Sequence, residues 1–140
     1  MSRKLLLTFL LFNVIFSLNT HDPEFEKKFK VEHIKEGDGK TFPKKYSLVF
    51  VHYNGYLLNG TKFDSSYDRK QPLRFTLGVG RVIKCWDMAV ERLSLGEKIS
   101  VICPYDLAYG DRGDGRMIPP KTDLKFEMEL MKIHEEFDDL

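Results

Sequence analysis

Aromatic and apolar side chains recur where a strand or helix is expected to end, or in a connection between elements. Connections run over the surface of a protein and are mostly polar, so such side chains indicate a surface that binds an apolar group. The set consists of Tyr53, Phe63, Val82, Ile83, Trp86, Tyr109, Ile118 and Phe126. Side chains of these types are suited to binding an apolar group with exclusion of water.

Covalent and metal chemistry find little support in the sequence. The histidines His21, His33, His52 and His134 are scattered without the spacing of metal ligands, and the chain has no Cys/His cluster of the zinc type. Cys85 together with a distant histidine could in principle form the site of a thiol hydrolase, but no local signature accompanies it. We therefore expect no metal and no cofactor.

The elements that must position the apolar side chains are mostly strands. Apolar and charged residues alternate over 124–130, a period of two that predicts a strand with one buried face. A stretch rich in β-branched and aromatic residues leads into Asn59-Gly60, a strong signal for a hairpin turn. The other strands are expected over 46–58, 61–63, 73–77 and 98–103. The sheet should therefore be antiparallel and contain about five strands.

One helix is expected between the third and fourth of these strands. Apolar residues recur there at helical spacing from Val82 to Leu93, and Gly96 follows where a left-handed cap is wanted. A single amphipathic helix of about three turns can cover one face of a small sheet. The expected fold class is therefore α+β, an antiparallel sheet of about five strands wrapped around one short helix.

Length and charge indicate one domain with a balanced surface. A chain of 140 residues is long enough for one domain with a core and too short to suggest two. Its 22 basic and 21 acidic residues are interspersed, which argues against nucleic acid or an acidic partner recognised through overall charge. The folded domain is expected over 29–134.

The N-terminus has the layout of a signal peptide. Arg3 and Lys4 precede an apolar run that ends at Leu18, and a strongly charged segment follows. The run falls short of the roughly 20 residues that span a bilayer, so a membrane anchor is the weaker interpretation. We expect a cleaved signal peptide over 1–20, with a loose boundary, and a mature protein without a membrane segment in the lumen of the endoplasmic reticulum.

Three smaller features bear on the compartment. An acidic tail is expected over 135–140, and its end, Phe137-Asp138-Asp139-Leu140, resembles a degenerate lumenal retrieval signal or has no such role. Asn59-Gly60-Thr61 is a glycosylation sequon, although the turn alone explains it. Cys85 and Cys103 could pair in an oxidising compartment, but the sequence cannot place their Cβ atoms, and free thiols are the slight preference.

Five short motifs resemble successive motifs of the FKBP family of peptidyl-prolyl cis-trans isomerases. They occur in the order and spacing of that family, and the similarity covers about 31–133. The motifs are Val51-His52-Tyr53-Asn54-Gly55, Lys62-Phe63-Asp64-Ser65-Ser66, Val82-Ile83-Lys84-Cys85-Trp86-Asp87, Ala108-Tyr109-Gly110 and Ile118-Pro119-Pro120. Together with the leader, they identify a similarity to secretory-pathway members of the family.

The resemblance implies a shallow pocket that has Trp86 as its floor. Its aromatic walls would be Tyr53, Phe63, Phe75 and Phe126, completed by Val82, Ile83 and Ile118. By the same correspondence, the Ile83 N–H and the Tyr109 hydroxyl bind carbonyl oxygens of the substrate or of a macrolide such as rapamycin, and Asp64 borders the pocket as an acceptor. The implied partners are proline-containing polypeptides and macrolide inhibitors, and a monomer is expected.

Simpler interpretations stay open for several residues. Phe75, Phe126 and Trp86 fit ordinary core packing, and the Tyr109 hydroxyl could satisfy local backbone. Asp64 could cap a turn or pair with Arg69.

The chain also departs from the family pattern in ways that bear on function. Cys85 stands where a Gly is common, Leu73 replaces a frequent aromatic, and Gly80-Arg81 differs from the usual pair. Cys85 would narrow the pocket floor or make it sensitive to oxidation, or else be a packed and inert thiol. The departures at Leu73 and Gly80-Arg81 put inhibitor affinity in doubt more than isomerisation. The alternative function is a chaperone-like module that binds proline segments or macrolides without catalysis.

Overall fold

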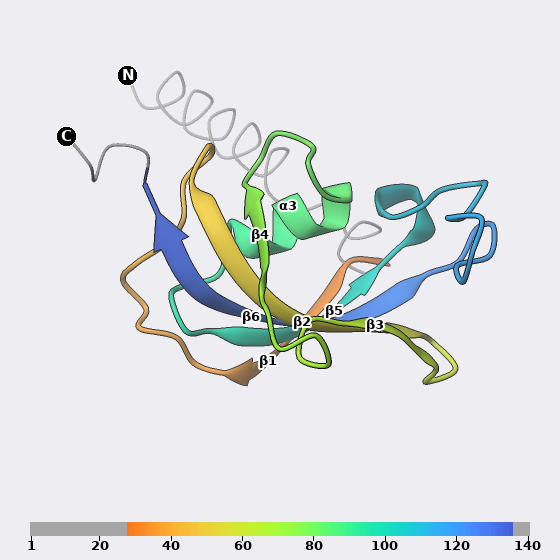
Figure 1. Cartoon of the computed structure of the whole chain (residues 1–140), viewed down its shortest axis with the longest axis horizontal. Coiled ribbons are helices and arrows are strands. Elements are labelled where there is room, and N and C mark those ends of the chain that lie inside the picture. Colours follow the sequence, from red (N-terminus) through yellow and green to blue (C-terminus); the bar gives the residue numbers. More distant parts are fainter. Residues whose placement is uncertain (1–27, 136–140) are drawn as a thin grey trace, which may run out of the picture.

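The computed structural model describes residues 28–135 (Figure 1). The expected signal peptide over 1–20 and all but the first residue of the tail over 135–140 lie outside the described residues. No helix within 28–135 is long and apolar enough to cross a membrane. The elements are β1 (Lys30–Lys35), β2 (Leu48–Leu57), β3 (Lys62–Ser65), β4 (Leu73–Thr76), α3 (Lys84–Val90), β5 (Lys98–Cys103), the 3₁₀ helix η1 (Tyr105–Leu107) and β6 (Leu124–His134).

The strands form one six-stranded sheet in which every pairing is antiparallel. The order is β1-β5-β6-β2-β3, and β4 also pairs with β2. One edge of the long strand β2 is thus shared, because its first half pairs with β4 and its second half with β3. The helix α3 lies against one face of the curved sheet (Figure 1). The expected α+β class is confirmed.

One of the six strands, β1, was not predicted from the sequence. It pairs with β5 from Lys30↔Ile102 to Lys35↔Lys98, and five of its six residues are exposed. An edge strand with little buried surface carries only a weak hydrophobic pattern, because few of its positions need an apolar side chain. This explains why the sheet has six strands where about five were expected.

The hairpin at Asn59-Gly60 has the form that the sequence predicted. Leu57 N–H donates to Thr61 O at 2.9 Å, and Gly60 N–H donates to Leu57 O at 2.9 Å. Gly60 has a φ of 93°, a region that favours glycine. The Asn59 side-chain oxygen accepts the Thr61 N–H at 2.9 Å, so the asparagine stabilises the turn itself. Glycosylation of Asn59 stays a prediction.

The helix is shorter than the apolar pattern indicated. It covers Lys84–Val90, because Ile83 has an extended ψ of 146° and the chain leaves helical geometry after Glu91. Gly96 does adopt a left-handed φ of 84°, but it lies too far beyond Val90 to cap the helix. Its N–H donates to Leu130 O at 2.8 Å, so this glycine serves the turn into β5 instead.

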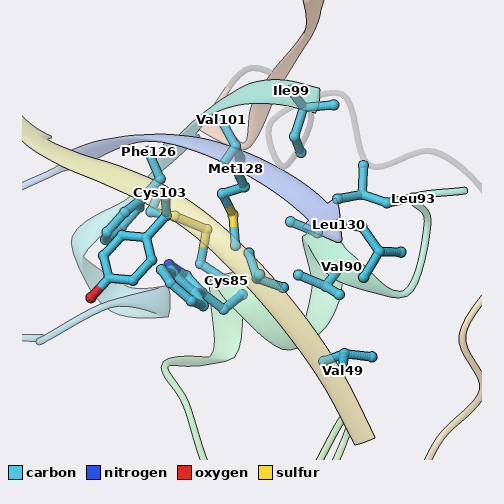
Figure 2. Packing of buried hydrophobic residues seen from close by; sticks show 14 of the residues in the cluster. Val49, Cys85, Val90, Leu93, Ile99, Val101, Cys103, Phe126, Met128 and Leu130 are labelled. Atoms are coloured by element: carbon cyan, nitrogen blue, oxygen red, sulfur yellow. A yellow bond between two sulfur atoms is a disulfide. The ribbon is translucent and has the colours of Figure 1, made fainter. Parts of the chain in front are cut away.

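The core lies between α3 and the inner face of β2, β5 and β6 (Figure 2). Alternate residues of β6, from Leu124 to Leu130, are buried, as the period of two predicted. Cys85 on α3 and Cys103 at the end of β5 form a disulfide, and both side chains are fully buried. The preference for free thiols was therefore wrong. Their Cα atoms lie 5.7 Å apart, within bridging range, a proximity that arises from packing and not from sequence spacing.

Candidate active site

A pocket of about 320 Å³ opens between α3, the strands β2, β3, β4 and β6, and the segments that flank them. It brings together eight of the ten residues that the resemblance assigned to one site. The pocket is lined by Tyr53, Phe63, Asp64, Leu73, Arg81, Val82, Ile83, Trp86, Tyr109 and Phe126. Phe75 and Ile118 are not among the lining residues; both are buried core residues, exposed by 6% and 4%.

Aromatic rings packed edge to face form the floor and walls of this pocket. The ring centre of Tyr53 lies 4.6 Å from the ring centre of Trp86, at an interplanar angle of 78°. The ring centre of Phe126 lies 5.3 Å from that of Trp86, at an angle of 89°. Phe75 packs against the same indole at 5.9 Å, from within the core. Trp86 is only 4% exposed, so it belongs to the core and to the pocket at once. Core packing and pocket lining thus coexist for Trp86 and Phe126.

One glycine permits the close approach of two wall residues. Gly55 of β2 is paired with Phe126 of β6 on one side and with Asp64 of β3 on the other. A Cβ atom at this position would lie 2.7 Å from Phe63 Cζ and 3.0 Å from Phe126 Cε1. Contacts this short would force the rings apart, so the two phenylalanines can meet at 5.8 Å only because residue 55 has no side chain.

Tyr53, Asp64 and Arg69 form a closed hydrogen-bonded group at one wall. The Tyr53 hydroxyl donates to Asp64 Oδ2, and the Arg69 guanidinium pairs with Asp64 Oδ1. Arg69 Nη2 also donates to the Tyr53 hydroxyl at 2.9 Å, and Ser65 N–H donates to Asp64 at 2.9 Å. Asp64 thus lines the pocket and pairs with Arg69, while its role as an acceptor toward a substrate stays a prediction.

Burial and hydrogen bonding set the protonation of this group. Burial, reinforced by the hydrogen bond to Asp64, raises the pKa of Tyr53 to about 12. For Asp64, burial favours the neutral form, but the hydrogen bonds from Tyr53 and Arg69 outweigh it and lower the pKa of the carboxyl. Tyr53 therefore stays protonated and Asp64 ionised at neutral pH, which suits a fixed wall and not a proton donor.

We expect Asp64→Asn to destabilise the protein at neutral pH and to lose this effect in acid. A lowered folded-state pKa contributes stability above the ordinary value of 3.8, and the contribution disappears as the pH falls through the folded-state pKa. Urea unfolding of wild type and variant at a series of pH values measures the difference. An exposed carboxylate outside this group, Asp111, provides the control variant Asp111→Asn. An unchanged difference between wild type and Asp64→Asn from pH 7 to pH 2 would contradict the assignment.

Two hydrogen-bond donors of the pocket have no acceptor among residues 28–135. The Ile83 N–H lies just before α3, and none of the described residues accepts from it. The Tyr109 hydroxyl likewise makes no hydrogen bond within this range, and its side chain is 40% exposed. Burial, with the charges of Asp114 and Asp64, raises the pKa of Tyr109 and keeps the hydroxyl protonated. Both groups are therefore available to a carbonyl oxygen of a ligand.

Sequence reasoning did not assign two of the lining residues, Leu73 and Arg81, to the site. Both had been noted as departures from a family pattern, so their position in the chain was recognised but not their place in the pocket wall. Leu73 opens β4 directly after Pro72, and Arg81 precedes Val82. The available signal was position next to the assigned Val82 for Arg81, and alternation with the assigned Phe75, two residues further on, for Leu73.

Comparison with known proteins agrees with this geometry. Residues 39–131 match the family model described as FKBP-type peptidyl-prolyl cis-trans isomerase. FK506-binding protein 1 of Rhizopus delemar is 55% identical over 104 residues, covering 74% of this chain and 96% of the relative. Peptidyl-prolyl cis-trans isomerase Fkbp12 of Drosophila melanogaster is 50% identical over 104 residues, with the same coverage. FK506-binding protein 1 of Saccharomyces cerevisiae is 49% identical over 109 residues, covering 78% and 96%. The chain therefore belongs to the family of FKBP-type peptidyl-prolyl cis-trans isomerases.

Proposed function

We propose that this isomerase accelerates rotation about X-Pro bonds in polypeptides that fold in the secretory pathway, by desolvating the amide and holding the carbonyls beside it. The observation that carries the proposal is a pocket with an aromatic floor and two donors that have no acceptor within residues 28–135, the Ile83 N–H and the Tyr109 hydroxyl. An aromatic surface and isolated donors are what a prolyl ring with its flanking carbonyls requires.

The chemistry needs no bond to be broken. Rotation about an X-Pro bond faces a barrier near 20 kcal/mol, because resonance gives the C–N bond partial double-bond character. The planar amide is more dipolar than the twisted one, so transfer from water into an apolar pocket disfavours the planar form. Each 1.4 kcal/mol of that difference is worth about tenfold in rate. Desolvation against aromatic rings can thus provide a large part of the catalysis.

The residues divide into a surface, two donors and a fixed wall. The prolyl ring rests on Trp86, while Ile83 N–H and the Tyr109 hydroxyl bind the neighbouring carbonyl oxygens and orient the chain. Val82 and Phe63 contact the ring at the side, and the group around Asp64 holds Tyr53 in place. Phe75 and Ile118 act from behind the pocket, as packing that keeps the wall residues in position.

Exchange between cis and trans forms of an Ala-Leu-Pro-Phe peptide tests the proposal. We expect a rate that rises in proportion to enzyme concentration, measured by exchange spectroscopy without an auxiliary protease. Saturable binding of the peptide without a rate gain would support the alternative, a non-catalytic module that binds proline segments. A rate no higher than in buffer, with no binding, would remove the assignment of this pocket.

We expect Tyr109→Phe to lower kcat/KM by roughly fivefold while leaving the fold intact. The substitution removes one hydroxyl that makes no hydrogen bond within residues 28–135, so little stability depends on it. A neutral hydrogen bond to the substrate carbonyl is worth about 1 kcal/mol, which corresponds to a factor of about five in rate. The peptide exchange assay and a urea unfolding curve give the two readouts. Tyr105→Phe, at the start of η1, is the matched control, and full activity of Tyr109→Phe would reduce Tyr109 to scaffold.

The buried disulfide supports an oxidising compartment. Disulfides persist in secreted proteins and in the lumen of the endoplasmic reticulum, and they are rare in the cytosol. Together with the signal-like N-terminus, Cys85–Cys103 favours a lumenal isomerase with a domain over 29–134. Mass spectrometry of the mature protein tests this, because cleavage near residue 20 is expected. A mature chain that begins at Met1 would contradict the proposed location.

Macrolide binding is proposed for the same pocket. Two of the relatives above are named FK506-binding proteins, and the same donors that hold a substrate carbonyl can hold a macrolide carbonyl. Leu73 and Arg81 line this pocket and depart from the family pattern. We therefore expect these two residues to change the affinity for macrolides more than they change the rate of isomerisation. Competition of FK506 with the peptide in the exchange assay measures the affinity.

A further inference from the structure

A second hollow, of about 550 Å³, lies beside the isomerase pocket. It is lined by Phe50, Arg69, Gln71, Pro72, Leu73 and Arg74. Leu73 lines both hollows, and Arg69 reaches from the second one to Asp64 and Tyr53 of the first. A polypeptide whose proline occupies the isomerase pocket can therefore continue into the second hollow within a few residues, since an extended chain advances about 3.3 Å per residue.

The second hollow has a row of cations around an aromatic ring. Phe50 of β2 is paired with Arg74 of β4 on one side and with Lys132 of β6 on the other. Side chains of directly paired residues project from the same face of a sheet. This face is the outer one, because Val49 and Val51, which flank Phe50, are buried on the side of α3. Lys132 Nζ lies 5.4 Å from the centre of the Phe50 ring.

The local charge of this hollow differs from the balanced charge of the whole chain. None of the residues that line it is acidic. The charge of Arg69 is compensated by Asp64, whereas Arg74 and Lys132 form no ion pair within residues 28–135. Arg74 and Lys132, beside an aromatic ring and a pocket and without a counter-ion among the described residues, are complementary to carboxylates.

We propose that this cationic groove, defined by Phe50, Arg69, Gln71, Pro72, Leu73, Arg74 and Lys132, binds acidic side chains that lie a few residues from the isomerised proline. The inference rests on the isomerase function and adds a substrate class to it. Exposed ion pairs are individually weak, because water and salt screen both charges. Two of them correspond to a preference of about fivefold in kcat/KM, which should weaken as salt screens the charges.

Peptides that differ only in charge test the proposal. Glu-Glu-Ala-Leu-Pro-Phe-Ala and Ala-Leu-Pro-Phe-Ala-Glu-Glu place carboxylates before and after the proline, and the same peptides with Gln provide the neutral reference. We expect kcat/KM of at least one Glu peptide to exceed that of its Gln partner about fivefold at low salt. In the double variant Arg74→Gln with Lys132→Gln, the ratio should fall to about one.

A matched variant separates local from overall charge. The double variant Lys30→Gln with Lys40→Gln removes the same amount of charge at a distance from the groove. Lys30 lies in β1, at the end of the sheet away from β2, and Lys40 lies in the segment after β1. This variant should keep the preference for the Glu peptides. Equal rates for Glu and Gln peptides, with normal activity on both, would overturn the groove and leave the isomerase function intact. No activity on any peptide would contradict the isomerase function itself. A dimer by sedimentation that is lost in the Arg74/Lys132 variant would assign the groove to a second copy of the chain and overturn the proposal.

Discussion

We expect Trp86→Ala to lower the free energy of unfolding by about 3–5 kcal/mol and to abolish isomerase activity at the same time. The indole is 4% exposed and contacts the rings of Tyr53, Phe75 and Phe126, so its removal opens a void at the centre of the aromatic cluster. The same void takes away the surface on which the prolyl ring rests. Small domains have a total stability of about 5–15 kcal/mol, so a considerable part of it depends on this side chain.

Loss of folding and loss of chemistry must be distinguished in this experiment. Trp86→Phe keeps an aromatic ring and most of the packing, and it removes the indole Nε1–H, which is buried without a partner within residues 28–135. This variant should therefore stay folded and retain part of its activity. Urea unfolding gives the folded fraction of each variant, and kcat/KM per folded molecule gives the catalytic effect. Wild-type activity per folded molecule in Trp86→Ala would show that Trp86 supports the fold and takes no part in catalysis.

Much of the fold could be predicted because its strands alternate. β6 is long and has one buried face from Leu124 to Leu130, so its period of two is unmistakable. The hairpin was equally clear, since Asn-Gly is the dipeptide that tight hairpin turns prefer. β1 is exposed along nearly its whole length, and nothing in its pattern distinguishes it from a connection. The helix was predicted too long, because apolar residues up to Leu93 serve the core from a turn as well as from a helix.

The site could be predicted where a single residue has a specific chemical type. Trp86 and Tyr109 belong to recognisable motifs, and the structure places both in one pocket. The requirement for Gly55 could not be read, because it depends on how closely Phe63 and Phe126 approach across three strands. Of the closed group of Tyr53, Asp64 and Arg69, only the ion pair between Asp64 and Arg69 could be proposed from the sequence. The hydrogen bond from Tyr53 to Asp64 depends on how β2 and β3 are aligned, which the sequence alone does not give.

Removal of the Cys85–Cys103 disulfide should lower the free energy of unfolding by about 3 kcal/mol. The two cysteines are 18 residues apart in the sequence. A disulfide that closes a loop of this length stabilises the folded state by about that much, because it restricts the unfolded chain. For a domain of this size the midpoint of thermal unfolding should fall by roughly 10–20 °C. Cys85→Ala with Cys103→Ala is the test variant, measured by urea and thermal unfolding against oxidised wild type.

Reduction of the wild type provides the independent comparison. Both cysteines are fully buried, so reductant reaches the bridge only when the domain opens, and reduction has to be carried out in denaturant before refolding. The free energy of unfolding of reduced wild type should then equal that of the double Ala variant, apart from the packing lost with the two sulfur atoms. Reductant should leave the stability of the variant unchanged.

The bridge also connects the floor of the pocket to one of its donors, because Cys85 adjoins Trp86 and Cys103 ends the strand before the segment that carries Tyr109. Activity of the reduced protein should therefore decline at lower temperature than that of the oxidised protein. Equal unfolding midpoints for the oxidised and fully reduced wild type would show that the bridge adds nothing to the stability of the domain.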